Sequence, residues 1–235
     1  LFGNAIQVRL CAEDPGAAFL PSSGSVSLFN VPQGEGVRVD TGIQTGDVVS
    51  PFYDSMVAKI IVWGETRDAA RLRLYSALRA TTLLGVDNNR EFLMALLTDS
   101  TFVAGAATTD FVDECYPDGY KSPPLSSVEV AAGIVLQQIS ASEYYFGNAL
   151  SVSSELRSWM STGFISMGFR FEAEGESFTA TVITHPDKKY EIHLADAIHT
   201  IILEQFRSGS ATLTIDGERD VYFFCILNPS LINIS

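Results

Sequence analysis

The run of residues 56–63, MVAKIIVW, constrains the fold most strongly, because Lys59 is its only charged residue. A short apolar run that is rich in β-branched residues is typical of a strand. Two more strand-like segments precede it, one around Arg38 at residues 37–39 and one running from residue 48 to residue 54. Residues 4–11 have the same character, and we expect all of these segments to extend one sheet.

Arg38 lies between Val37 and Val39 in an apolar segment, where a permanently charged guanidinium needs a partner. Its five donors suit a planar oxyanion, or a carbonyl oxygen that becomes negative. A structural ion pair with Asp40 or Asp54 is the competing interpretation, since most such arginines are structural. The residues by themselves leave both interpretations open.

Three helices are predicted after these strands. The first covers residues 66–80 with Thr66 as its N-cap, and the others cover residues 89–97 and 110–116. The apolar stripe of the first helix consists of Ala70, Leu74, Ala77 and Leu78. Its four arginines would suit a basic site, but a solvated face or a subunit contact is the favoured interpretation.

A domain boundary is predicted at residues 121–127, KSPPLSS, which contain two prolines and three serines. The predicted domains are therefore residues 1–120 and residues 121–235. Residues 125–146 read as a long helix that opens the second domain, with Ser126 or Ser127 as its N-cap.

Residues 163–235 have an all-β pattern. Residues 148–161 before them are serine-rich and poorly defined, with room for a short helix at residues 155–160. The predicted strands cover residues 164–172, 177–185, 190–194, 198–206, 211–215 and 220–227, with another beginning at residues 231–234.

Turn residues separate these strands, as at residues 174–176, 185–188, 208–210 and 216–218. Successive short hairpins predict an antiparallel sheet that curls toward a barrel, which the long helix fills or covers. The fold class is therefore α+β: an antiparallel sheet with flanking helices, followed by a long helix and an antiparallel β-barrel-like domain.

The composition, 46% hydrophobic and 18% charged, allows a sizeable core. The net charge of −13 and the lack of a basic patch argue against nucleic acid as a partner. No apolar run is long enough for a transmembrane helix, so no membrane partner is expected. Cys11, Cys115 and Cys225 are far apart in sequence, which fits small buried hydrophobes in a reducing compartment.

Metal and hydrolase sites have little support in the sequence. Glu13 and Asp14 would suit Mg²⁺ or acid–base work, but a turn in which Asp14 caps the following backbone is favoured. His185, His193 and His199 lack a convergent carboxylate pattern, so we expect surface or half-buried histidines and no metal site. No GxSxG motif is present, so a hydrolase triad has no support.

Collinear blocks in the first half resemble the C-terminal part of the biotin carboxylase module of biotin-dependent carboxylases: GNAIQVRLCAEDP, FLPSSGSV, GVRVDTGIQTGDVVSPFYDSMVAKIIVWGETRDAA, LLGVDNN and TTDFVDECYPDGY. Together they are far more specific than a short motif. The later half is more weakly similar to the linking domain (BT-like domain) of acyl-CoA carboxylase α subunits of the propionyl-, methylcrotonyl- and geranyl-CoA type. The chain thus resembles a fragment of such an α subunit.

The resemblance assigns roles to individual residues. Arg38 matches the arginine that holds the biotin ureido oxygen and stabilises its enolate, which is charge stabilisation by a fixed donor fork. Phe111 matches a residue that packs against the adenine of ATP, and core packing is the alternative for this ring. Trp63 and Arg67 match positions of dimer contact in related modules.

The resemblance also implies the cofactors biotin, ATP and Mg²⁺, bound mostly by an ATP-grasp core that would precede Leu1. The chain alone is therefore expected to be a fragment without carboxylase activity. Gln7 and Asn4 depart from the Glu and His of many members, and neither departure should abolish the fold.

The implied function is ATP- and bicarbonate-dependent carboxylation of biotin, for transfer to an acyl-CoA on a carboxyltransferase β subunit. The implied partners are that β subunit, a biotinyl carrier domain and bicarbonate, in a hetero-oligomer. The alternatives are a non-catalytic assembly scaffold and the same module in a pyruvate or urea carboxylase. The implied location is the mitochondrial matrix in a eukaryote and the cytoplasm in a bacterium. The acyl-CoA stays open, because the partner subunit selects it.

Overall fold

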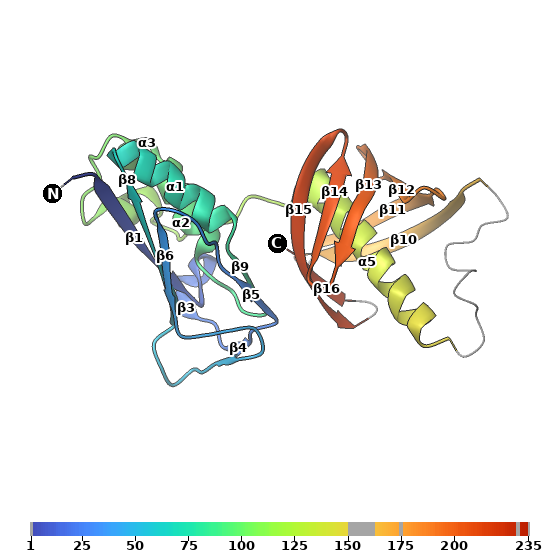
Figure 1. Ribbon diagram of the computed structural model, residues 1–235, viewed down its shortest axis with the longest axis horizontal. Helices are drawn as coiled ribbons and strands as arrows, with labels where there is room; N and C mark the ends of the chain where they lie inside the picture. The colour runs from blue at the N-terminus through green and yellow to red at the C-terminus, as the bar shows by residue number, and fades with distance from the viewer. Residues whose placement is uncertain (1, 150–162, 174–175, 229–230, 235) are drawn as a thin grey trace. The chain divides into compact units, whose positions relative to one another are not determined.

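The computed structural model describes residues 2–149, 163–173, 176–228 and 231–234 (Figure 1). The chain divides into two compact units, Leu1–Pro123 and Pro124–Ser235. The division falls within the proline- and serine-rich residues 121–127. The short helix considered at residues 155–160 and the turn residues 174–175 lie outside the described residues.

The first unit is built on a three-stranded antiparallel sheet with the order β1–β8–β6. β8 (Met56–Gly64), the apolar run with one charge, is its central strand, between β1 (Asn4–Cys11) and β6 (Val37–Thr41). Both edge strands pair with β8 along their length, so β8 is hydrogen-bonded on both sides. This arrangement confirms the predicted strands at residues 4–11, 37–39 and 56–63.

The strand predicted for residues 48–54 is wrong for most of its length. Only β7 (Val48–Val49) forms there, and it pairs with β4 (Gly24–Ser25) rather than with the three-stranded sheet. Pro51 lacks the amide that a strand needs, and Phe52 and Tyr53 are 89% and 84% exposed. The remaining short strands form two pairs: β2 (Glu13–Asp14) with β3 (Leu20–Pro21), and β5 (Leu28–Asn30) with β9 (Thr82–Leu84).

Helix α1 (Arg67–Arg79) covers one face of this sheet (Figure 1). The Thr66 hydroxyl accepts a hydrogen bond from the amide of Ala69 at 3.1 Å, which confirms the predicted N-cap. The predicted apolar stripe is the buried face, and it packs against Ile60 and Val62 of β8.

Three further α-helices belong to the first unit: α2 (Arg90–Thr98), α3 (Ser100–Val103) and α4 (Phe111–Cys115). The sequence predicted α2 and α4 within one or two residues and missed α3, which is a single turn capped by Asp99. A one-turn helix carries too little periodicity to be recognised in a sequence.

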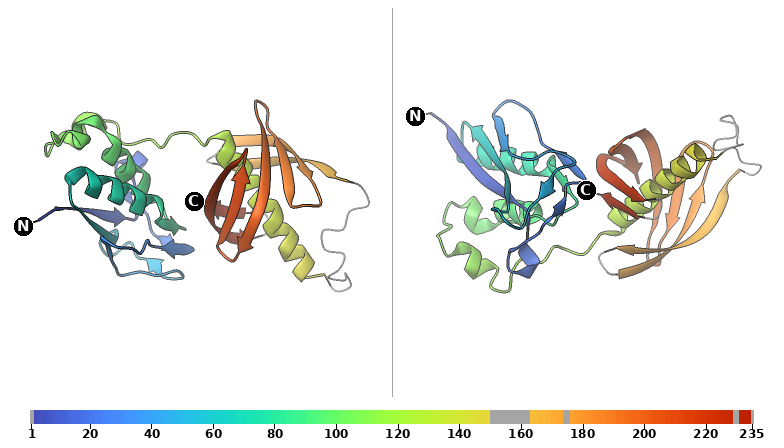
Figure 2. Two further views of the ribbon diagram at one scale, coloured as in Figure 1. Left: turned by 45° about the horizontal axis from the view of Figure 1, so that its top comes forward. Right: turned by 90° about the horizontal axis from the view of Figure 1, so that it is seen from below.

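The second unit begins with α5 (Ser127–Gly147). Ser126 is the N-cap and forms a capping box with Glu129, in which each side chain bonds the other residue's amide. The antiparallel sheet that follows has the sequential order β10 to β16 (Figure 2). Its strands are β10 (Ile165–Ala173), β11 (Glu176–Thr184), β12 (Lys189–His193), β13 (Ile198–Arg207), β14 (Ser210–Ile215), β15 (Glu218–Asn228) and β16 (Leu231–Ile234).

The sheet curls around α5 without closing into the predicted barrel (Figures 1 and 2). No pairing between β10 and β16 occurs in the described residues. One core joins α5 to the strands, with Leu136 of the helix and Ile192, Ile201 and Leu213 of the sheet fully buried. Because the helix supplies the second layer of this core, the sheet buries its apolar face without closing on itself.

Among the described helices, none has both the length and the hydrophobicity required to cross a membrane.

Leu74→Ala should destabilise the first unit by about 2–5 kcal/mol, because Leu74 is fully buried between α1 and the sheet. Leu72→Ala, on the same helix but 50% exposed, is the matched control and should change stability by about 0.5 kcal/mol or less. Urea unfolding of the two variants measures the difference, and an equal loss in both would contradict this packing.

Candidate functional site

The strand β6 separates its apolar and charged residues onto opposite faces of the sheet. Val37 and Val39 pack against the core beneath α1. Successive side chains of a strand point to opposite faces, so Arg38 and Asp40 project from the other face. We call this second face of β1, β8 and β6 the outer face.

Strand register brings three cations together on the outer face. Lys59 of β8 is directly opposite Asp40 of β6 and Arg9 of β1. Arg38 is opposite Ile61, one row further along the same face. Directly opposed residues of an antiparallel pair share a face, so Arg9, Arg38 and Lys59 form a local positive site beside one carboxylate.

Arg38 and Asp40 form a two-point ion pair. Arg38 Nε donates to Asp40 Oδ1 at 2.9 Å, and Arg38 Nη2 donates to Asp40 Oδ2 at 3.0 Å. The hydrogen bond from Arg38 lowers the pKa of Asp40, with a further contribution from Lys59, and the same bond raises the pKa of Arg38. The structural partner that the sequence offered as an alternative is therefore Asp40; Asp54 instead accepts a bond from the amide of Met56 at 3.2 Å.

The ion pair leaves much of the guanidinium open. The Arg38 side chain is 73% exposed, and in the described part of the chain its Nη1 has no acceptor. The bonds to Asp40 fix the plane of the guanidinium through Nε and Nη2. Such a fork can hold a second oxygen, neutral or anionic, without first releasing the carboxylate.

The predicted adenine contact, Phe111, is the first residue of α4 and is 6% exposed. The ring is buried in this chain, as the core-packing alternative requires, and a role in binding adenine stays a prediction.

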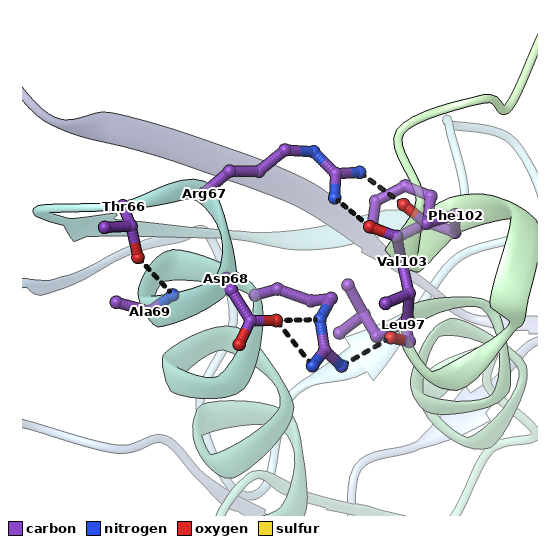
Figure 3. A network of polar contacts seen from close by, with 8 residues as sticks. Thr66, Arg67, Asp68, Ala69, Leu97, Phe102 and Val103 are labelled. Carbon is purple, nitrogen blue, oxygen red and sulfur yellow. Dashed lines mark hydrogen bonds and ion pairs between the residues drawn. The ribbon is translucent and has the colours of Figure 1, made fainter.

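Trp63 and Arg67 make contacts within the first unit. The indole Nε1 of Trp63 donates to the carbonyl of Phe2 at 3.3 Å. The guanidinium of Arg67 donates to the carbonyls of Phe102 and Val103, and its Cζ lies 4.9 Å from the Phe102 ring centroid (Figure 3). Arg67 therefore ties α1 to α3, and a dimer contact at these positions stays a prediction.

The neighbouring arginines of α1 also bond within the unit. Arg71 pairs with Asp68 at 2.7 Å and donates to the carbonyl of Leu97 at 2.9 Å (Figure 3). Arg73 donates to the carbonyl of Trp63. Of the two interpretations that the sequence favoured, the solvated face is wrong for Arg71 and Arg73, because main-chain carbonyls at the ends of β8 and α2 lie within reach of these long side chains. The subunit contact stays a prediction.

Comparison with known proteins identifies the first unit. Residues 7–114 match the family model described as "Biotin carboxylase C-terminal domain". The first unit is a biotin carboxylase C-terminal domain.

Three relatives show how far the similarity extends. The mitochondrial propionyl-CoA carboxylase α chain of Sus scrofa is 34% identical over 222 residues, which are 92% of this chain and 27% of the relative. The biotin carboxylase of Halalkalibacterium halodurans is 46% identical over 112 residues, 48% of this chain and 25% of the relative. The biotin carboxylase domain of Hydrogenobacter thermophilus 2-oxoglutarate carboxylase, solved with MgADP, ADP and bicarbonate, is 34% identical, with a TM-score of 0.50 over 52% of this chain and 27% of that one. The chain spans about a quarter of the length of these relatives.

The acidic pair of this biotin carboxylase domain has a structural role. Asp14 Oδ1 accepts a hydrogen bond from the amide of Gly16 at 2.8 Å, which confirms the predicted capping turn. Glu13 accepts a bond from the hydroxyl of Ser55. No group of three His, Cys, Asp or Glu residues suited to a metal occurs in the described ranges.

The three cysteines are free thiols. Cys115 is exposed, so the prediction of a small buried hydrophobe is wrong there. It is the last residue of the five-residue helix α4, which is too short to bury more than one face. Cys11 and Cys225 are partly buried.

The sequence singled out Arg38 but missed Arg9 and Lys59 as its companions on the outer face. Their strands are distant in sequence, so the cations meet only through the pairing of β1 and β6 with β8. Lys59 carried a usable signal, since it is the single charge in an apolar strand.

Arg38→Gln should raise the pKa of Asp40 toward its ordinary value, because the hydrogen bond from Arg38 is the largest cause of its lowering. In the wild type, the lowered pKa of Asp40 stabilises the folded state at pH values above the pKa that Asp40 has in the unfolded chain. This stabilisation is lost as the pH falls through the pKa of Asp40 in the folded chain. Carboxyl-carbon NMR titration measures the shift. Arg9→Gln, which removes an outer-face cation not bonded to Asp40, is the matched control and should have a smaller effect.

Proposed function

We propose that the chain is part of the α subunit of a biotin-dependent acyl-CoA carboxylase, and that its second unit is the domain linking the carboxylase module to a carboxyltransferase β subunit. This proposal rests on the length of the match to the propionyl-CoA carboxylase α chain. Similarity to the propionyl-CoA carboxylase α chain runs through both units, over 222 residues, whereas similarity to the Halalkalibacterium biotin carboxylase covers 112. A carboxylase module alone would not account for similarity in the second unit.

Arg38 is the residue of this chain to which we assign a direct part in the reaction. Biotin, when bound, accepts the carboxyl group on a ureido nitrogen, and the adjacent ureido oxygen becomes more negative as that nitrogen is activated. Arg38 fits this group, because Nη1 is open and Asp40 fixes the orientation of the guanidinium. A preorganised donor of this kind stabilises charge that develops during the reaction.

Lys59 and Arg9 support this assignment electrostatically. They add positive charge to the outer face of a chain whose net charge is −13. Both proposed reactants, bicarbonate and the enolate form of biotin, are anionic. A local positive site attracts them despite the acidity of the whole chain.

ATP and Mg²⁺ are proposed cofactors of the intact subunit, with bicarbonate as its substrate. The described residues do not converge on a metal site, and the Phe111 ring is buried. The catalytic contribution that we propose for this chain is therefore the contact between Arg38 and biotin. The acyl-CoA class suggested by the relative that matches both units is propionyl-CoA.

Arg38→Ala, introduced into the intact subunit, should slow carboxylation of free biotin by about 100-fold while leaving ATP binding unchanged, since one preorganised donor to a developing oxyanion is lost. Arg38→Lys should recover little, because an ammonium lacks the planar fork. ATP-dependent bicarbonate fixation into biotin and a separate nucleotide-binding titration measure the two effects.

Arg219→Ala is the matched control. Arg219 is also an exposed arginine in an ion pair, with Glu204 at 2.6 Å, but it lies in the second unit. This variant should carboxylate biotin at the wild-type rate. Unchanged turnover in Arg38→Ala would remove the assigned role.

A further inference from the structure

A serine, a histidine and an aspartate of the second unit form one chain of hydrogen bonds. The Ser127 hydroxyl lies 2.9 Å from His199 Nε2, and His199 Nδ1 lies 2.6 Å from Asp216 Oδ2. The histidine is 72 residues from the serine and 17 from the aspartate. A hydrolase triad had no support in the sequence, because the chain has no GxSxG motif and because these three residues meet only through the fold.

The carboxylate determines which nitrogen of His199 carries the proton. Hydrogen bonds from His199 and from the amide of Thr200 lower the pKa of Asp216, which keeps it an ionised acceptor. Nδ1 must therefore donate to Asp216. In the neutral imidazole this leaves the lone pair of Nε2 directed at the hydroxyl of Ser127, the tautomer that a general base requires.

The imidazole is held rigidly in this orientation. His199 is 7% exposed on β13, and Asp216 lies in the tight turn between β14 and β15. Asp216 has a φ of 52° and Gly217 a φ of 93°, as the Asp-Gly turn of a hairpin requires. The amide of Thr200 donates to Asp216 Oδ1 at 2.8 Å and fixes the carboxylate against β13.

Ser127 is exposed and is the first residue of α5. The hydroxyl of the preceding residue, Ser126, already accepts from the amide of Glu129 and donates to its carboxylate. The amides of Ser127 and Val128 belong to the first helical turn, where amides lack intrahelical acceptors. They belong to the serine itself and to the residue after it, and we assign them as the main-chain donors to an oxyanion formed there.

We propose that Ser127 is an activated nucleophile, with His199 as its general base and Asp216 as the residue that positions His199. The substrate class is small activated carboxylic esters and thioesters that reach the exposed hydroxyl from solvent. This activity is separate from the role proposed for Arg38 and does not depend on it.

The proposed step balances without a further cofactor. Ser127 Oγ forms a bond to the carbonyl carbon as its proton passes to His199 Nε2. The bond to the leaving alcohol or thiol breaks, and that group takes the proton from His199. Water, deprotonated by His199, then attacks the acyl carbon, which releases the carboxylic acid and restores Ser127.

Treatment of the 235-residue chain with diisopropyl fluorophosphate, followed by peptide mass spectrometry, tests the nucleophile. The adduct should form on Ser127 and not on Ser126, an internal control in the same peptide whose hydroxyl is bonded to Glu129. Ser127→Ala should abolish the adduct, and Ser142→Ala, at an exposed serine further along α5, should leave it unchanged.

The roles of His199 and Asp216 are tested by measuring reaction rates in variants. His199→Gln should slow labelling of Ser127, and release of p-nitrophenol from p-nitrophenyl acetate, by about 100-fold. Asp216→Asn should slow both reactions while a thermal unfolding scan shows the variant still folded. Absence of preferential Ser127 labelling in the folded wild type would overturn the proposal, and so would equal rates in folded His199→Gln. A purely structural cluster would change only the unfolding temperature.

Discussion

The alternation of buried and outward-facing residues along β6 and β8 is the constraint on which the first unit depends. Ile60 and Val62 are buried beneath α1, while Lys59 and Ile61, which alternate with them along β8, lie on the outer face. A shift of one residue in the pairing of β6 with β8 would turn Arg38 into the core and the valines into solvent. Packing under α1 therefore fixes the register, and the register places the cations together.

The pairing of Arg38 with Asp40 makes its structural and functional interpretations compatible. The carboxylate occupies two of the guanidinium nitrogens and leaves the third open. An exposed pair of this kind adds little to stability, so its main physical effect is to restrict the orientation of the side chain. This restriction is what a donor to a developing oxyanion needs, because less reorganisation then accompanies the reaction.

In the second unit, the helix α5 completes the hydrophobic core, and its first turn is held in place by hydrogen bonds. Leu136 and its neighbours on α5 complete the core that the curled sheet cannot complete alone. The start of the same helix is fixed by the Ser126–Glu129 capping box and by the contact between Ser127 and His199. Because the helix start is held against β13, an exposed serine stays in hydrogen-bonding distance of a buried imidazole.

The sequence by itself determined most of the local structure. The N-cap at Thr66, the stripe of α1, the turn at Asp14 and the strands of the second unit follow rules that act within a few residues. The collinear blocks of the first half also sufficed to place it in the biotin carboxylase family. Arg38 was recognised because a charge in an apolar strand is unusual at the level of sequence.

The tertiary structure alone decided which distant residues meet. It paired residues 48–49 with β4 rather than with β8, gave Arg67 the carbonyls of α3 as partners, and brought Ser127 to His199 across 72 residues. Local periodicity reports which face of an element is buried, but not against which other element it packs. Strand order, ion-pair partners and the histidine contact depend on that packing, because they join residues whose distance in space is unrelated to their separation in sequence.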